Sequence, residues 1–540
     1  MLLPLAASEA KRDDQALLSA YAQARIADSA GAAGRAAEGY AAMLALSPDN
    51  ELLAARALSQ AMAAGDRALA LNAARILEKG DLLAPDARLL LLSEALRTRD
   101  WKAAGLHIDR IDREQVFSFM TPVLRAWLAY GSKQGDPLAI LAAARTDALA
   151  GAYAAEHQPL MLLANGKEKE GVAALLTMAE GAGGRASRLR VAGAALLASQ
   201  GDRKRAAALL AGDAAPLAAA RALLDARQPI PGSIDTAAAG VAEFLVRVAV
   251  DLHGQDVTPL ALTYARLATF LAPENSETWL VTSELLAAQD QPQAALAVLA
   301  NIAPGDPFAA SAEDMRIRLL IATGDRAGAL AAAEAAVKGE APSAAHWARL
   351  GDLYGELDRR EDAAEAYGQA LARAKQGGSP QPEWALHLLR GGALEEAGRW
   401  PEAKASLEAA YRLAPDQPVV LNYLGYAQLE RHENMEEAEK LIREASRLQP
   451  DDAAITDSLG WALYLKGEVP KAIPILERAA QGEPADAAIN EHLGDAYYSI
   501  GRRFEARYAW EAALLHAEET DAPRLRAKID TGLTPALASP

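Results

Sequence analysis

The sequence is built from copies of one short pattern, and this repetition constrains the fold more than any other feature. A Leu-Gly pair recurs toward the C-terminus, and Gly425, Gly460 and Gly494 are 34 or 35 residues apart. An alanine follows twelve residues after the last two glycines, at Ala472 and Ala506, and a second small residue comes seven residues later. A chain of such copies forms a row of similar units, each packed on its neighbours, without one central core.

The same register runs through most of the 540 residues. Upstream of residue 340 other residues replace the glycine, but an alanine still follows twelve positions later. These pairs are Ala24 and Ala36, Leu58 and Ala70, Leu92 and Ala104, Trp127 and Ala139, Met161 and Ala173, Ala195 and Ala207, Ala249 and Ala261, Ser283 and Ala295, and Ile317 and Ala329. Because the register breaks at 214–248, the sequence predicts six repeats, an interruption and eight more, about fourteen in all.

Each copy has the features of a helical hairpin. Ala and Leu, the strongest helix formers, are abundant, and only 5% of the residues are aromatic. The small residues at fixed positions allow two helix axes to approach closely. Glycine turns such as Gly467-Glu468 and Gly501-Arg502 end the first helix, and Pro415 or Pro450 follows the second. The chain is therefore predicted to be all-α.

The pattern resembles the tetratricopeptide repeat family, in which a large apolar residue, Leu-Gly, Tyr, Ala, an aromatic residue and Ala stand at fixed offsets. The matching residues of one copy are Trp347, Leu350, Gly351, Tyr354, Ala363, Tyr367 and Ala370. The resemblance implies a right-handed superhelical solenoid of about fourteen hairpins, in which the first helix of each repeat lines a concave groove. It also implies a scaffold or adaptor that binds other proteins.

The repeat pattern divides the chain into five predicted segments. Residues 1–8 are a signal-peptide remnant or a frayed terminus, 9–213 a degenerate N-terminal solenoid, and 214–248 an irregular junction. Residues 249–518 form the C-terminal solenoid, and 519–540 hold a capping helix around 524–529 and a tail. The junction is either a hinge or an irregular repeat.

Composition and motifs argue against several classes of function. The net charge of −17 disfavours nucleic-acid binding, and no apolar run reaches the ~18 residues that cross a bilayer. The chain has no Cys, and its eight His residues lack the spacing of metal ligands. Phosphate-binding loops, zinc-protease motifs and serine-hydrolase motifs are missing from the sequence. We therefore expect no catalytic residues, no metal and no cofactor, and we expect that the protein is not an enzyme.

The candidate binding residues lie beside the Leu-Gly pairs of the last repeats. Positions spaced by three or four residues share one helix face, which the family resemblance assigns to the groove. The predicted groove residues are Asn422, Tyr426, Asp457, Trp461, Tyr464, Glu491, Asp495 and Tyr498. Aromatic side chains supply contact area and carboxylates select Lys or Arg, which predicts a partner with apolar and basic residues. The alternative is that the aromatics pack inside the repeats and the carboxylates form a solvated face.

Three segments, 421–426, 457–461 and 492–497, are similar to the C-terminal part of large bacterial tetratricopeptide repeat proteins of the cell envelope. The resemblance implies a periplasmic location, with the cytoplasm as the alternative. Beside the adaptor, it leaves two other roles open. One is a non-catalytic recognition subunit of an enzyme complex such as a periplasmic processing protease. The other is a structural component of an envelope assembly or polysaccharide export machine.

Overall fold

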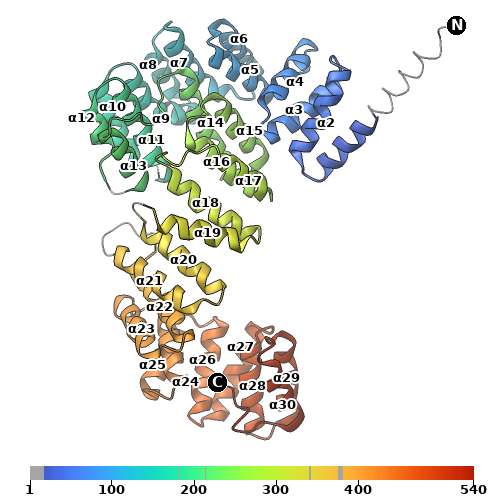
Figure 1. Cartoon of the computed structure of the whole chain (residues 1–540), viewed down its shortest axis with the longest axis vertical. Coiled ribbons are helices and arrows are strands. Elements are labelled where there is room, and N and C mark those ends of the chain that lie inside the picture. The colour runs from blue at the N-terminus through green and yellow to red at the C-terminus, as the bar shows by residue number, and fades with distance from the viewer. Residues whose placement is uncertain (1–17, 182, 213, 340–341, 375–380, 540) are drawn as a thin grey trace, which may run out of the picture. The chain divides into compact units, whose positions relative to one another are not determined.

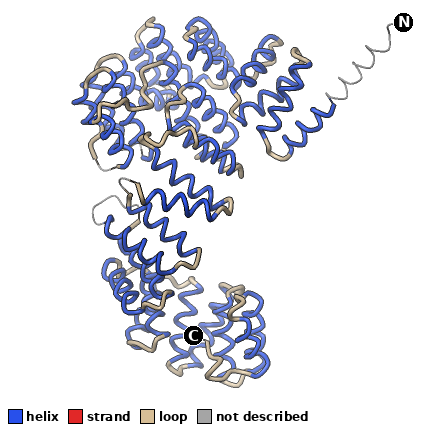
Figure 2. The backbone as a smooth tube through the Cα atoms, viewed as in Figure 1, coloured by secondary structure: helices blue, strands red, loops and turns tan. Residues whose placement is uncertain are grey.

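The computed structural model describes residues 18–181, 183–212, 214–339, 342–374 and 381–539, and within these ranges every regular element is a helix (Figure 2). The all-α fold predicted from the sequence is therefore confirmed. Every helix in the described part of the chain is too short or too polar to span a lipid bilayer. The predicted segment 1–8 lies outside the described residues.

The small residues of the repeat stand where the two helices of a hairpin touch. In α26 (Ala453–Leu465), a Cβ added to Gly460 would lie 2.6 Å from the Leu476 side chain in α27 (Val469–Gly482). Gly467 ends the first helix with a φ of +79°, a conformation that glycine adopts at little cost. Asp452 begins the same helix by accepting a hydrogen bond of 2.9 Å from the Ile455 amide. The repeat spacing thus encodes close helix contact, one turn and one cap.

The chain forms two compact units, Met1–Ala332 (unit 1) and Ala333–Pro540 (unit 2), and the division falls within α19. In unit 1, residues 18–29 are helical and pair with α2. The other helices of unit 1 are α2 (Ala33–Leu46), α3 (Glu51–Ala64), α4 (Arg67–Lys79), α5 (Pro85–Thr98), α6 (Trp101–Glu114), η1 (Ser118–Met120), α7 (Thr121–Ser132), α8 (Pro137–Ala143), η2 (Ala144–Thr146), α9 (Ala148–Ala164), α10 (Glu168–Ala179), η3 (Gly183–Arg185), α11 (Ala186–Ser199), α12 (Arg203–Leu209), α13 (Ala215–Asp225), α14 (Ala237–His253), α15 (Thr258–Leu271), α16 (Ser276–Ala287), α17 (Pro292–Leu299), α18 (Ala309–Ala322) and α19 (Arg326–Val337).

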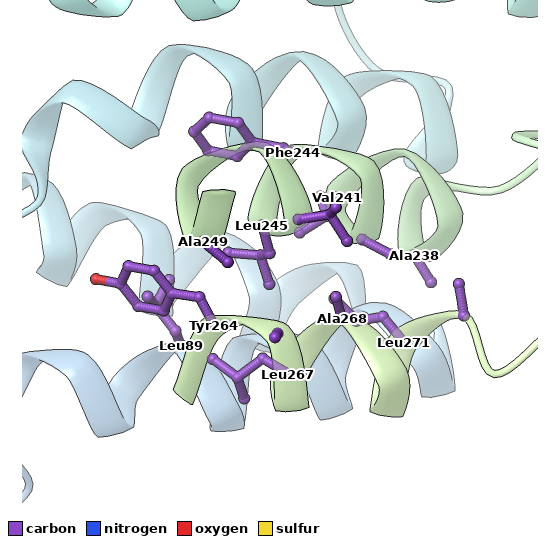
Figure 3. Packing of buried hydrophobic residues seen from close by; sticks show 14 of the residues in the cluster. Leu89, Ala238, Val241, Phe244, Leu245, Ala249, Tyr264, Leu267, Ala268 and Leu271 are labelled. Carbon is purple, nitrogen blue, oxygen red and sulfur yellow. The ribbon is translucent and has the colours of Figure 1, made fainter. Parts of the chain in front are cut away.

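Unit 1 covers much of its own inner face, which we define as the face made by the first helices of successive hairpins. The first helices α5, α7 and α9 pack against α14, and α3 and α5 pack against α15 (Figure 1). Leu89 of α5 lies beside Tyr264 of α15 in a buried cluster that also contains Leu267 of α15 and Phe244 and Leu245 of α14 (Figure 3). The hairpin of α14 and α15 therefore covers much of the surface made by the earlier first helices.

The predicted junction at 214–248 lies within unit 1 and contains α13, a loop and most of α14. Helix α13 packs on α11 and α12. The loop is held by Arg188, which donates a hydrogen bond of 2.8 Å to the Gly232 carbonyl, and by the buried side chains of Ile230 and Ile234. This segment returns the chain to the first helices that α14 covers.

A buried ionic cluster fixes α14 against its neighbours. The Glu243 side chain, 1% exposed, accepts hydrogen bonds from Arg188 at 2.8 Å, from Arg185 at 2.9 Å and from the Asn275 amide at 2.9 Å. Arg185 also pairs with Glu277 at 3.0 Å. Burial alone would raise the pKa of Glu243, but the two guanidinium groups hold the pKa below its usual value. The cluster is paired internally.

Unit 2 is a regular row of hairpins, each first helix packed on its own second helix. Its helices are α20 (Ala344–Glu356), α21 (Arg360–Ala374), α22 (Glu383–Glu396), α23 (Trp400–Leu413), α24 (Pro418–Glu430), α25 (Met435–Leu448), α26, α27, α28 (Ala487–Ser499), α29 (Arg503–His516) and α30 (Ala522–Thr531). The last of these follows the final hairpin, packs on α29 and buries Leu525. The domain boundaries inferred from the sequence stay predictions.

Candidate functional site

The first helices of three successive repeats, α24, α26 and α28, line a pocket of about 390 Å³ on the inner face of unit 2. Its wall residues come from four first helices and one helix cap: Glu395 at the end of α22; Asn422, Tyr423, Tyr426, Ala427 and Glu430 of α24; Ala454, Asp457 and Ser458 of α26; and Asp486, Ala488, Ile489 and His492 at the start of α28. Every wall residue except Asp486, which caps α28, belongs to a first helix. The pocket is therefore a direct product of the repeat.

Helix periodicity explains which side chains reach the pocket. On α24, Asn422, Tyr426 and Glu430 are spaced by four residues and form one stripe along the helix. The repeat period of 34 or 35 residues brings Asp457 of α26 to the position that Asn422 holds on α24. The same spacing places Glu491 of α28 in that position one repeat later.

The pocket carries more negative than positive charge. Four carboxylates line it, from Glu395, Glu430, Asp457 and Asp486. Arg431 pairs with Glu395 at 2.6 Å and lies 3.7 Å from Glu430. Burial raises the pKa of Glu430, and the neighbouring charge of Glu395 raises it further.

Tyr426 and Tyr423 donate hydrogen bonds to neighbouring glutamates, and their pKa values are raised. Burial, together with the charges of Glu430 and Asp457, raises the pKa of Tyr426, whose hydroxyl hydrogen-bonds Glu430. Burial and Glu395 raise the pKa of Tyr423 in the same way. Both phenols are therefore neutral donors at neutral pH.

His492 and Asp457 form the floor of the pocket. Nδ1 of His492 lies 2.8 Å from Oδ2 of Asp457, and both side chains are buried. Burial by itself lowers the pKa of His492, but Asp457, with smaller contributions from Asp495 and Glu491, raises it above the usual value. Oδ1 of Asp457 has no hydrogen-bond partner among the described residues, and neither does Oδ1 of Asn422.

A stack of three rings supports this floor. The indole of Trp461 lies 4.6 Å from the ring of Tyr464 and 4.0 Å from that of His492, and all three rings are nearly parallel. Trp461 is only 1% exposed, whereas Tyr464 is half-buried. The structure thus places Trp461 beneath the pocket, where it positions His492 and does not form a wall.

The chain's own C-terminal helix occupies the next position along the inner face. Lys528 of α30 is fully buried, and its ammonium lies 2.6 Å from Glu491 and 2.8 Å from both oxygens of Asp495. Arg524 of the same helix forms a two-point contact with Glu491, at 2.8 and 3.0 Å. Burial raises the pKa of Glu491, but these two cations hold it below the usual value.

The structure divides the residues predicted to bind. Asn422, Tyr426 and Asp457 come together in the pocket. Glu491 and Asp495 are paired with α30, and half-buried Tyr498 lies against Trp510 and Gly532. Their role in binding a partner stays a prediction.

The sequence prediction missed several polar wall residues, among them Glu430, His492 and Glu395. Glu430 stands one helical turn after Tyr426, so the same stripe already indicated it. His492 and Glu395 gave no such signal. His492 aligns with Ser458 of the preceding repeat, and Glu395 reaches the pocket from the far end of α22.

Most polar atoms that line the pocket are hydrogen-bond acceptors. Among the described residues, no group of three or more His, Asp or Glu side chains has the arrangement of a metal site. The carboxylates and the two unpartnered oxygens are hydrogen-bond acceptors, and the tyrosine rings offer apolar surface. Such a surface suits an ammonium or guanidinium group carried on an aliphatic stem.

Comparison with known proteins agrees with this architecture. Two family models described as tetratricopeptide repeat match residues 348–418 and 394–460. A search of curated protein sequences finds no match.

Three solved structures are similar to this chain. A tetratricopeptide repeat protein from Parabacteroides merdae is 14% identical, covering 48% of this chain and 99% of its own, with a TM-score of 0.40. A thermophilic tetratricopeptide repeat protein from Thermus thermophilus is 23% identical, covering 35% and 98%, with a TM-score of 0.30. A chain of an APC/C hetero-tetramer is 16% identical and covers 96% of both chains, with a TM-score of 0.38.

The two family models cover α21 to α25, together with most of α20 and α26, and this part of unit 2 has the glycine, alanine and turn positions of the repeat. The remaining hairpins continue the same helical pairing on both sides. The chain is therefore an all-α solenoid protein, and its residues 348–460 match the tetratricopeptide repeat family.

Proposed function

We propose that the chain is a non-catalytic adaptor that binds a partner protein on the inner face of unit 2, in the pocket formed by α24, α26 and α28. Tetratricopeptide repeats are protein-interaction scaffolds, and the pocket is the observation that carries the specific proposal. It combines tyrosine surface, surplus carboxylates and unpartnered acceptor oxygens in one concave place.

The packing of unit 1 favours unit 2 as the place where the partner binds. In unit 1, α14 and α15 cover the first helices α3, α5, α7 and α9. The ionic groups of that contact are paired with one another, as Glu243 is with Arg185 and Arg188. Unit 2 presents its corresponding helices α24, α26 and α28 as pocket walls.

Filling the pocket without disturbing the core tests the proposal. Ala454 lies on the pocket wall and is exposed, so Ala454→Arg places a long side chain in the pocket and removes no packing contact. Ala405, on the second helix α23, is also exposed and is not a wall residue, which makes Ala405→Arg the matched control.

The measurement is a cross-linked pull-down from the source cells with the wild-type chain and both variants. We expect a discrete partner that the wild type and Ala405→Arg retain and that Ala454→Arg loses. A partner that persists with Ala454→Arg contradicts the proposed site.

A further inference from the structure

We infer that the pocket of α24, α26 and α28 is a receptor for a single lysine side chain of the partner, with Asp457 as its main ligand. The inference rests on the proposed function and adds the chemistry by which the partner is recognised. It is carried by the pocket itself, by a buried carboxylate oxygen without a partner, and by the way the chain binds its own lysine one repeat later.

The Asp457 carboxylate is buried at the pocket wall and is only partly hydrogen-bonded. This residue is 6% exposed, and it is a wall residue of the pocket. Oδ2 is used by His492 at 2.8 Å, but Oδ1 has no hydrogen-bond partner among the described residues. A buried carboxylate oxygen left unpaired costs free energy, and an ammonium donor relieves that cost when it binds.

The pocket has more carboxylates than positively charged groups. Four carboxylates, from Glu395, Glu430, Asp457 and Asp486, line the pocket. Arg431 pairs with Glu395, and His492 adds a second positive charge only when it is protonated. A lysine ammonium therefore meets a net negative site even when His492 is charged. The rings of Tyr423 and Tyr426 offer apolar surface for the four-carbon stem.

The chain binds a lysine of its own at the equivalent position one repeat later. Glu491 stands 34 residues after Asp457 and holds the same position on its helix. There the chain supplies its own lysine: Lys528 is fully buried and lies 2.6 Å from Glu491 and 2.8 Å from Asp495. The inner face of the last repeat thus already buries an ammonium against carboxylates, and Asp457 offers a similar acceptor one repeat earlier.

The difference between the two positions explains why one is filled from within. At the last repeat, α30 follows α29 directly and packs across the end of the row. The pocket around Asp457 lies one repeat further in, and α30 contributes no residue to its walls. A lysine for this position therefore comes from another molecule.

The test uses the full chain and a probe that carries only the proposed group, Nα-acetyl-lysine methylamide. Nα-acetyl-norleucine methylamide has an aliphatic side chain of similar length without the ammonium and is the control ligand. Binding is measured by saturation-transfer difference NMR, in which the ligand signal reports contact with a large protein.

We expect a saturable signal from the lysine probe and none from the norleucine probe. Asp457→Asn keeps the size of the side chain and removes its charge, so it should weaken binding at least about tenfold. Glu444→Gln removes a carboxylate of α25 that pairs with Arg447 outside the pocket, and binding should be unchanged. Ala454→Arg fills the pocket and keeps the Asp457 side chain, so it should abolish the signal even if Asp457→Asn folds poorly.

The inference is overturned if the lysine probe gives no saturable signal, if the norleucine probe binds equally well, or if folded Asp457→Asn and Ala454→Arg both bind like the wild type. Its failure is distinguishable from that of the proposed function. A partner that Ala454→Arg loses in the pull-down, together with no lysine binding, leaves the adaptor site in place and removes only the lysine.

Discussion

Units 1 and 2 are built from the same kind of hairpin, yet they use their inner faces in opposite ways. In unit 1, α14 and α15 pack onto the first helices α3, α5, α7 and α9 (Figure 1). In unit 2, α24, α26 and α28 are the walls of a pocket. Stacked hairpins therefore form an inner face in both units. Whether that face is buried or accessible to a partner depends on where the later helices of the chain pack.

Buried charge shows the same contrast. Glu243 in unit 1 is surrounded by Arg185, Arg188 and Asn275, so its oxygens are fully used. Asp457 in unit 2 is comparably buried but has one oxygen without a partner. A closed ionic cluster serves stability and specificity of packing, whereas an incomplete one marks a place where a ligand completes the set.

The largest effect should come from opening the closed cluster. Glu243→Ala leaves Arg188, which is also buried, without its main partner, and we expect unit 1 to lose about 3–5 kcal/mol of stability. Urea unfolding followed by circular dichroism measures the loss. Glu444→Gln, which removes an exposed ion pair, should leave the curve unchanged. An equal response of the two variants would show that the cluster does not hold α14 in place.

The second largest effect should come from removing the internal lysine of unit 2. Lys528→Met leaves Glu491 and Asp495 buried without their ammonium, which should destabilise the last repeat by about 3 kcal/mol. Because a repeat protein loses stability locally, amide hydrogen exchange should accelerate in α28 to α30. Lys471→Met, at an exposed position of α27, is the control. Uniform exchange in both variants would contradict the role of α30 as a bound internal ligand.

A smaller effect, with opposite signs in the two units, should follow from pH. His157 in unit 1 is buried and accepts a hydrogen bond from the Trp127 indole, and burial lowers its pKa to about 3. The unfolded chain takes up a proton near pH 6.5, so the contribution of His157 to stability falls as pH decreases from about 6.5 toward 3. The slope is at most about 1.4 kcal/mol per pH unit.

His492 in unit 2 behaves in the opposite way, because Asp457 raises its pKa in the folded state above the unfolded value. Its contribution is complete below about pH 6.5 and is lost as pH rises through the raised folded value. Hydrogen exchange of α9 and of α28, measured between pH 5 and 9 and corrected for intrinsic exchange, should show the two slopes. His157→Gln and His492→Gln should each flatten one slope, and a common sign in both units would contradict the assignment.

The smallest effect concerns the pocket wall. Tyr426→Phe removes the hydroxyl that hydrogen-bonds Glu430 and keeps the ring, so the stability of unit 2 should fall by only about 1 kcal/mol. Thermal unfolding measures the change. A loss of several kcal/mol would mean that Tyr426 is a core residue like Trp461 and is not part of the pocket wall.

The sequence predicted the hairpins well because their signals are local. The small residue at Gly460 and the turn at Gly467 lie within one repeat. The structure places Gly460 against Leu476 of the paired helix and Gly467 at the end of the first helix. The stripe of Asn422, Tyr426 and Asp457 also follows from helix periodicity and the repeat length, and the structure brings these three residues into one pocket.

The rest depends on contacts between distant segments, which spacing does not encode. Periodicity placed Asp495 on the inner face, but its pairing with Lys528 depends on a helix that folds back 33 residues later. Periodicity likewise does not say that His492 stacks on Trp461 from the next repeat, or that α14 packs onto α5 and α7. Helix periodicity therefore predicts which residues share a face of a helix. Which other helix packs on that face depends on long-range contacts that periodicity does not show.

The most direct test of the central contrast is photo-cross-linking with a photoreactive phenylalanine at two exposed positions, Ala454 in the unit 2 pocket and Ala55 on α3 in unit 1. The account predicts that the partner captured by the wild-type chain cross-links to position 454 and not to position 55, and that Nα-acetyl-lysine methylamide reduces the adduct. A partner that cross-links at position 55 and not at 454 would contradict it, because binding would then belong to unit 1, where α14 and α15 cover much of the inner face.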